Sequence, residues 1–197
     1  MNKLDVRNHL VQSLEALREL VGTPHEAVVQ KSVAVIDDQA KNYIARSPMM
    51  FLSSSNEQGQ CDVSPRGDYP GFVYVANAHQ LIIPERPGNR RADSLSNIIK
   101  NPHVGMVFLI PGMEEVLRVN GQAVLIREHP VLEKLQWQGK APAIGILVDV
   151  EECYVHCPRA LKSAGIWNQE SWPPKEQLPS SKDIFHAHLK INGYRLE

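Results

Sequence analysis

The sequence has few cysteines, no long apolar run and no surplus of charge. Its three cysteines are an odd number without the spacing of a disulfide framework. No apolar run approaches the length of a membrane span, and the first twenty residues carry acids where a signal peptide has an apolar core. With 21 basic and 22 acidic groups, the chain lacks the basic excess of nucleic-acid or membrane-surface binders. We expect a soluble, cytoplasmic protein with neither kind of partner.

Several familiar catalytic motifs are also missing, and two short clusters invite a metal. The chain has no GxSxG, Walker-type or GxGxxG sequence. In CYVHC, Cys153, His156 and Cys157 offer three zinc ligands, but a structural site needs four and no CxxC lies nearby. The other interpretation is a buried strand end. His186 and His188 would share one face if extended, or are simply surface residues. We predict no metal.

The first 46 residues have the pattern of helices. Apolar residues recur at helical spacing within Leu4–Val21, and Gly22 follows as a stop signal. Thr23 is expected to cap a second helix, and a third is expected over Asp37–Arg46. We predict that residues 1–46 are a helical extension packed on the barrel described next.

From residue 47 the pattern changes to short β-type segments bounded by turn residues. Helices are expected only at Arg91–Lys100 and Val131–Gln138, before a long alternating strand, IGILVDVEECYVHC. A βαβ fold would need helices between most strands, so the pattern predicts a mainly β fold, a small antiparallel barrel with added helices. The other strands are MMFLSS, CDVSP, FVYVA, QLIIP, HVGMVFLI and EVLRVNGQAVLIRE.

The end of the chain has a different composition. After a short helix in PRALKSAG, the segment SWPPKEQLPSSKDIFHAH is rich in proline and is expected to lie extended. We therefore divide the chain into a helical extension (1–46), a barrel (47–172) and a tail (173–197), which together form one domain.

The segment PERPGNRRADS has the features of an anion site. Pro87 and Gly88 make a turn, and Arg90 and Arg91 follow at the expected start of a helix. A helix start offers free amides, arginines add bidentate donors, and the Ser94 hydroxyl lies one turn on. Because cations at a helix start oppose the dipole, their presence favours a functional site over a solvated basic turn.

A second segment, DVSPRGDYPGF, holds an arginine at a turn. Arg66 stands between Pro65 and Gly67 and is flanked by Asp62 and Asp68. The segment could be a simple loop with an Arg–Asp pair, or it could position Arg66 for function.

Taken together, the two segments resemble a known family. The succession DVSPRGD, LIIPERPGNRRADSLSNIIKNPHVGMVFLIPG and LRVNGQA resembles the pyridoxamine 5'-phosphate oxidase-like FMN-binding split barrels. The resemblance covers about Ser47 to Trp172 and includes EECYVHCPRALKSAGIW, which points to a branch distinct from the true oxidase. It implies a split β-barrel fold, FMN as cofactor and a homodimer with flavins at the interface.

The resemblance also implies site residues. Asn89, Arg90 and Arg91, with Ser94 adjacent, stand where the family binds the FMN phosphate. Arg66 is implied to stabilise negative charge on the reduced ring. Trp167 could come from the partner and stack near the flavin, or anchor the dimer. The residues implied to lie along the ring and ribityl chain are Val63, Ser64, Pro65 and Arg66.

The resemblance leaves the reaction open. The true oxidase's C-terminal pattern of Arg and His is absent, so a vitamin B6 substrate is not implied, and no catalytic residue is assigned. We expect an FMN-dependent oxidoreductase that transfers a hydride or two electrons to or from a small molecule. The alternatives are a flavin-sequestering protein without turnover and a relative that binds deazaflavin or haem.

Overall fold

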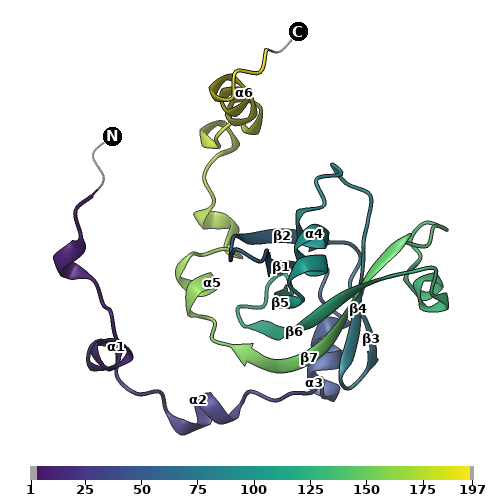
Figure 1. The fold of residues 1–197 in the computed structure, drawn as a ribbon, viewed down its shortest axis with the longest axis horizontal. Helices are drawn as coiled ribbons and strands as arrows, with labels where there is room; N and C mark the ends of the chain where they lie inside the picture. Colours follow the sequence, from purple (N-terminus) through teal and green to yellow (C-terminus); the bar gives the residue numbers. More distant parts are fainter. Residues whose placement is uncertain (1–3, 196–197) are drawn as a thin grey trace.

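The computed structural model describes residues 4–195, and its centre is a curled antiparallel sheet of seven strands (Figure 1). The strand order is β2-β1-β5-β6-β7-β4-β3, with every neighbouring pair antiparallel. The predicted mainly β fold, an antiparallel split barrel with added helices, is confirmed. Its strands are β1 (Met49–Ser55), β2 (Cys61–Gly67), β3 (Tyr74–Asn77), β4 (Gln80–Pro84), β5 (His103–Leu109), β6 (Val116–Arg127) and β7 (Ile144–His156).

Alternating side chains build the core of the barrel. Met50 and Leu52 of β1 are completely buried, and Met106 and Phe108 of the neighbouring β5 meet them on the same side of the sheet. Each such side chain contributes about 1.5–3 kcal/mol by leaving water. This period of two is the alternation of a strand with one buried face.

Helices α3 and α4 pack on the barrel. Helix α3 (Asp38–Ile44) begins where the Asp37 carboxylate accepts a hydrogen bond from the Ala40 amide at 2.7 Å, and it buries Ala40 and Ile44. Helix α4 (Asp93–Lys100) lies against β1, β2 and β6 and buries Ile98. It begins two residues later than predicted, because Ala92 is left-handed with φ 56°. Its packing fixes the loop before it.

The N-terminal segment stands away from the barrel (Figure 1). It forms a 3-10 turn (Arg7–His9), α1 (Leu14–Val21) and α2 (Glu26–Gln30), none of which buries a residue. The expected packing of residues 1–46 on the barrel is therefore found for α3 and not for α1 or α2; residues 1–3 lie outside the described range. The cap of α2 is His25 rather than Thr23, because the His25 side chain accepts from the Ala27 amide.

The C-terminal half also differs from expectation in two places. Helix α5 (Arg159–Ser163) forms as predicted, but the helix expected at Val131–Gln138 is a 3-10 helix over Pro130–Leu135. The tail is not extended throughout, because α6 (Ser181–Ile191) follows the 3-10 turns Gln169–Ser171 and Lys175–Gln177.

The helical form of the tail bears on the metal question. Ser180 caps α6 by accepting from the Asp183 amide at 3.2 Å. His186 and His188 are two positions apart, so a helix places them about 200° apart rather than on one face. Within residues 4–195 no group of three or more His, Cys, Asp or Glu side chains could hold a metal ion. No helix in that range is long and apolar enough to cross a membrane.

Candidate functional site

A cavity of about 330 Å³, here called the arginine cleft, opens between β2 and the loop that joins β4 to α4. Strand β2 supplies Ser64, Pro65 and Arg66, while the first turn of α4 supplies Ser94. The loop is held at both ends, by pairing of β4 with β7 and by the packing of α4. The two segments singled out in the sequence therefore face each other. The loop residues that line the cleft are Glu85, Arg86, Gly88, Asn89, Arg91 and Ala92.

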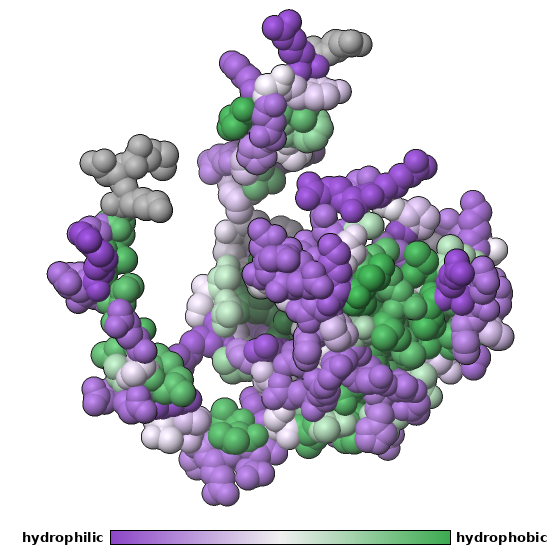
Figure 2. All heavy atoms as spheres, viewed as in Figure 1, coloured by the Kyte–Doolittle hydropathy of each residue, from purple (hydrophilic) through white to green (hydrophobic). Residues whose placement is uncertain are grey.

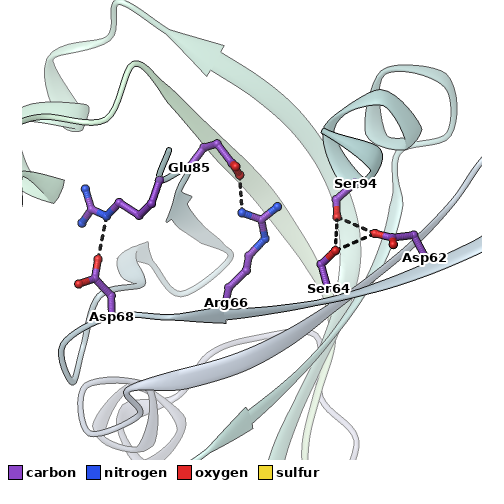
Figure 3. Close-up of polar contacts among 7 residues, drawn as sticks. Asp62, Ser64, Arg66, Asp68, Glu85 and Ser94 are labelled. Atoms are coloured by element: carbon purple, nitrogen blue, oxygen red, sulfur yellow. Dashed lines mark hydrogen bonds and ion pairs between the residues drawn. The ribbon is translucent and has the colours of Figure 1, made fainter. Parts of the chain in front are cut away.

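Two ion pairs span the cleft. Arg66 donates from Nη1 to Glu85, and Arg86 donates from Nε to Asp68 Oδ2 at 2.7 Å (Figure 3). Only 14% of the Arg66 side chain is exposed. Arg66 Nε and Arg86 Nη2 are buried with no hydrogen-bond partner among the described residues. A buried donor without an acceptor is costly, so these two groups indicate a place for an anionic ligand.

Beside the ion pairs, two serines share one carboxylate. Asp62 Oδ2 accepts from Ser64 Oγ at 2.9 Å and from Ser94 Oγ at 2.8 Å (Figure 3). Ser94 is buried. Because a hydroxyl has one proton, both hydroxyls donate to Asp62 in this arrangement, and their lone pairs remain for other donors. The contact joins β2 to α4 at the floor of the cleft.

The loop before α4 is strained at two positions. Arg90 and Ala92 both adopt a left-handed backbone, with φ 66° and 56°, which is uncommon for residues other than glycine. Asn89 Oδ1 accepts from the Arg91 amide at 3.0 Å and shapes the turn. The cap residue Ala92 has no side-chain acceptor to offer, so no side-chain cap covers the first amides of α4. Such amides are suited to an anion.

Arg91 sits at the mouth of the cleft and is three-quarters exposed. Its Nε donates to Asp93 Oδ2 at 2.8 Å, and this contact raises the pKa of Arg91 above its ordinary value. The charged guanidinium keeps its other N–H groups for a ligand, because the salt bridge uses only Nε.

A second cavity of about 570 Å³, the Trp137 cavity, adjoins the arginine cleft. The two share Arg86, Gly88 and Asn89 among their lining residues. Trp137 stacks on Tyr69, with ring centroids 4.8 Å apart and planes 19° from parallel. The arginine cleft therefore continues into a wider space with a flat aromatic wall. Other residues that line the Trp137 cavity are Pro87, Ala141, Pro142 and Ile144.

A third cavity of about 450 Å³, the Tyr43 cavity, lies between α3 and the ends of β6 and β7. It is lined mainly by apolar side chains, among them Val35, Leu117 and Cys153. Tyr43 donates to the carbonyl of Glu115 at 2.9 Å, and burial raises the pKa of its hydroxyl. Burial, with a smaller effect of Asp37, raises the pKa of the Cys153 thiol to about 11.

The buried thiol leads to a labelling prediction. Iodoacetamide near pH 8 should modify the exposed Cys61 and Cys157 readily and Cys153 only after unfolding. Because the folded pKa lies above the ordinary value of 9.0, the unfolded chain loses this proton first, and stability should fall as pH rises from 9 to about 11. Peptide mass mapping checks the labelling. Equal rates at all three thiols would contradict the buried position.

The family model described as pyridoxamine 5'-phosphate oxidase matches residues 36–157, more than half of the chain. The chain belongs to the pyridoxamine 5'-phosphate oxidase family. The matched region begins just before α3 and ends one residue after β7. It contains the barrel, the arginine cleft and the Trp137 cavity. It leaves out α1, α2, α5 and α6.

Solved structures agree on the fold of this family member. The HupZ protein of Group A Streptococcus is 17% identical over 61% of this chain and 93% of its own, with a TM-score of 0.50. A Lactobacillus delbrueckii protein, provisionally named a pyridoxamine 5'-phosphate oxidase, is 16% identical over 62% and 95%, with a TM-score of 0.50. At these identities the likeness shows the fold alone. The comparison with curated proteins found no match.

Most residues that the sequence proposed for the oxidase-family site come together. The arginine cleft is lined by Ser64, Pro65, Arg66, Asn89, Arg91 and Ser94, and Arg90 lines the Trp137 cavity.

Two proposed residues line neither cavity. Val63 is 61% exposed and points to the opposite face of β2 from Ser64. Trp167 follows α5 and donates from Nε1 to the carbonyl of Met113 at 2.9 Å. A flavin contact by Trp167 would have to come from another copy of the chain, and it stays a prediction.

Sequence reasoning did not find Arg86, Trp137 or Tyr69 as parts of the site. Arg86 lies inside the PERPGNRRADS segment, and its pairing with Asp68 of the RGD turn could have been proposed from the charges alone. Trp137 gives no such signal, because it reaches the cavity from a segment more than forty residues further along the chain.

Proposed function

We propose that this member of the pyridoxamine 5'-phosphate oxidase family binds FMN and acts as an oxidoreductase. The observation that carries the proposal is the pair of unpartnered buried donors, Arg66 Nε and Arg86 Nη2, in a cleft that continues into an aromatic cavity. FMN has the matching shape, with a dianionic phosphate at one end and a flat ring at the other.

The residues fit the two ends of FMN differently. Arg91, the uncapped amides of α4 and the Asn89 turn would hold the phosphate. Trp137, stacked on Tyr69, would present an apolar face to the ring and exclude water from it. Arg66 would stabilise negative charge that develops on the ring. When bound, FMN supplies two-electron or hydride transfer, and the chain binds and orients it.

Two further parts of the proposal concern assembly and reaction. We propose a homodimer with the flavin sites at its interface, in which Trp167 of one copy lies near the flavin of the other. The substrate is a small molecule. A cytoplasmic location remains an expectation of the sequence.

The composition of the cleft favours a flavin over haem. Within the described residues, neither the arginine cleft nor the Trp137 cavity is lined by His, Cys or Met. Haem iron takes its axial ligand from these side chains or from tyrosine.

The test is direct. Purified protein should be yellow, with the absorption bands of a flavin, and should release FMN on denaturation. A colourless protein that cannot be reconstituted with added FMN would overturn the cofactor proposal.

The same lining residues also support a second candidate, flavin sequestration without turnover. Among the described residues, neither cavity is lined by His or Cys, and the carboxylates that line the cleft, Glu85 and Asp93, are paired with Arg66 and Arg91 rather than free to act as a general acid or base. Oxidation of NADH or NADPH with added acceptors distinguishes the two. Saturable turnover favours the oxidoreductase, and turnover no faster than that of free FMN favours the binder.

Ser94 provides a graded prediction for this site. Ser94→Ala should weaken FMN binding by less than about tenfold, because the Ser94 hydroxyl already donates its proton to Asp62 and can only accept from FMN, and one such neutral hydrogen bond contributes about 0.5–1.5 kcal/mol. Fluorescence titration with FMN measures the change. A loss as large as that from removing the loop arginines would show that the hydroxyl turns from Asp62 to the phosphate.

A further inference from the structure

Two segments of the chain leave the barrel and bury no side chain of their own. We call residues 4–31 the N-terminal arm and residues 168–195 the C-terminal arm; every residue in both is exposed or only partly covered. Figure 2 shows apolar surface along both arms, which stand clear of the barrel. The family match, residues 36–157, ends before it reaches either arm.

The apolar content of the arms is high for free surface. The N-terminal arm has ten exposed large hydrophobic side chains, among them Leu14, Leu20 and Val21, and the C-terminal arm has six, among them Phe185 and Ile191. Helix α1 gathers Leu14, Leu17 and Val21 on one face, with Glu15 and Glu19 opposite. A helix of eight residues is marginal in water unless this face is covered.

Both arms are rooted at one place on the barrel. Val33, which follows the N-terminal arm, pairs with Cys153 of β7, and Lys31 Nζ donates to the carbonyl of Val155 at 2.8 Å. Strand β7 ends at His156, and the chain continues through α5 into the C-terminal arm. The arms therefore project from the same end of β7, beside the apolar Tyr43 cavity, which Val33 and Val155 help to line.

We infer that the two arms clasp a second copy of this chain at the face where they are rooted. A self-complementary contact of two identical faces gives a closed dimer, in which each copy's arms lie on the other's barrel. The inference rests on the proposed homodimer and not on the flavin. Both arms lie outside the region that the family model matches. We therefore assign the clamp to this chain and not to the family as a whole.

The available area is sufficient for such an interface. Covering one large aliphatic side chain removes roughly 60–120 Å² from water, so the sixteen side chains of the arms offer on the order of 1,000–1,900 Å² per chain. A standard stable interface needs about 800 Å² per partner.

The charges of the arms favour a protein over a membrane as the occupant. The N-terminal arm has four acids and three bases, and the C-terminal arm has three acids and four bases. Helices that lie on anionic lipid are rich in Lys and Arg on the polar face, whereas α1 carries Glu15, Arg18 and Glu19 there. The opposite net charges, one negative and one positive, also suit contact between an N-terminal and a C-terminal arm.

The test compares matched pairs of substitutions in the full-length protein. L14Q/L17Q makes the apolar face of α1 polar, and E15Q/E19Q introduces the same residue on the opposite face. Sedimentation over a range of concentrations should show a dimer for the natural chain and for E15Q/E19Q, and a dissociation constant at least a hundredfold higher for L14Q/L17Q. Because α1 buries nothing in its own barrel, thermal unfolding of the monomeric variant should remain cooperative.

A substitution on the receiving face completes the test. Val155→Gln, on the exposed end of β7, should weaken the dimer in the same direction. A natural chain that is monomeric at 100 μM (roughly the range in which weak dimers form), or an L14Q/L17Q dimer as tight as that of E15Q/E19Q, would overturn the inference. Two further results would overturn the inference. One is a monomeric natural chain whose α1 amides are protected from hydrogen exchange, and the other is a monomeric natural chain that binds phosphatidylserine vesicles.

The outcome is separable from that of the flavin proposal. A colourless dimer that L14Q/L17Q dissociates would keep the clamp and remove FMN. A yellow monomer would keep FMN and remove the clamp.

Discussion

Replacing Arg90 and Arg91 together by alanine is expected to weaken FMN binding by on the order of a thousandfold. Arg91 lines the arginine cleft, and Arg90 lines the adjoining Trp137 cavity, so the double variant removes one positive charge from each cavity. A phosphate monoester carries almost two negative charges near neutral pH, and charge-assisted contacts to it are among the strongest a protein makes. Quenching of FMN fluorescence on binding measures the dissociation constant.

A matched control separates local contacts from net charge. K100A/R127A removes two positive charges at exposed positions that line neither cavity, and it should leave the dissociation constant within about threefold. The barrel should stay folded in both double variants, because all four substituted side chains are exposed: Arg90, Arg91, Lys100 and Arg127. Unchanged FMN retention in the Arg90 and Arg91 double variant would place the phosphate elsewhere.

A smaller loss than expected would also be informative. Arg91 already pairs with Asp93, and Arg66 and Arg86 keep buried donors free. If the double variant retains most of its affinity while Arg66→Ala does not, the phosphate lies deeper, against β2. The structure offers both positions along one continuous cleft, and these two variants distinguish them.

The local sequence pattern was sufficient to predict the strands of the barrel. All seven strands appear in the predicted β-type segments, and β1 alternates because one of its faces lies in the core, as Met50 and Leu52 show. Strand β4 does not alternate, because four consecutive residues of it are buried. The helices were harder. Pro173 and Pro174 predicted an extended tail, yet α6 begins only after them, at a Ser180 cap. Proline affects its own turn and not the segment that follows.

The arms show what a single-chain pattern cannot predict. The leucines of α1 have helical spacing, which predicted a helix correctly but also suggested that it packs on its own barrel. Amphipathicity indicates that a face will be covered, and it does not identify the cover. The structure leaves that face exposed, with Leu14 at 74%, and so turns a packing prediction into a question about a partner.

The candidate site was predicted in part for a related reason. Neighbours in sequence such as Asn89 and Arg91 can be grouped from one motif, and the family resemblance joined them to Ser64 and Arg66. Trp137 required the fold, since a 3-10 helix after β6 carries the chain back to the mouth of the cleft. Long-range contacts of this kind leave no local pattern.

Gly121→Ala is expected to destabilise the barrel by about 3–5 kcal/mol or to leave no soluble protein. Gly121 lies in β6, where the pairing with β7 shifts by one residue, so that Asn120 pairs with Glu152 and Gly121 with Val150. A Cβ added at Gly121 would overlap the carbonyl oxygen of Asp149, and the γ-methyl of Val148 lies 3.3 Å away on the same side. Neither long strand can move without breaking pairs to β5 or β4.

Another glycine in the same sheet gives the control. Gly67→Ala in β2 would place its Cβ 3.5 Å from the carbonyl oxygen of Pro48, which is ordinary contact, and β2 is an edge strand that can adjust. Urea unfolding of the FMN-free proteins should therefore show a midpoint near that of the natural chain for Gly67→Ala and a large decrease for Gly121→Ala. Equal midpoints for the two variants would mean that β7 relaxes around the bulge, and the close approach of β6 and β7 would then be a preference rather than a requirement of the fold. A large decrease would identify the bulge as the point that sets the register of the two longest strands, and with it the position of β4 and of the loop that begins at Glu85.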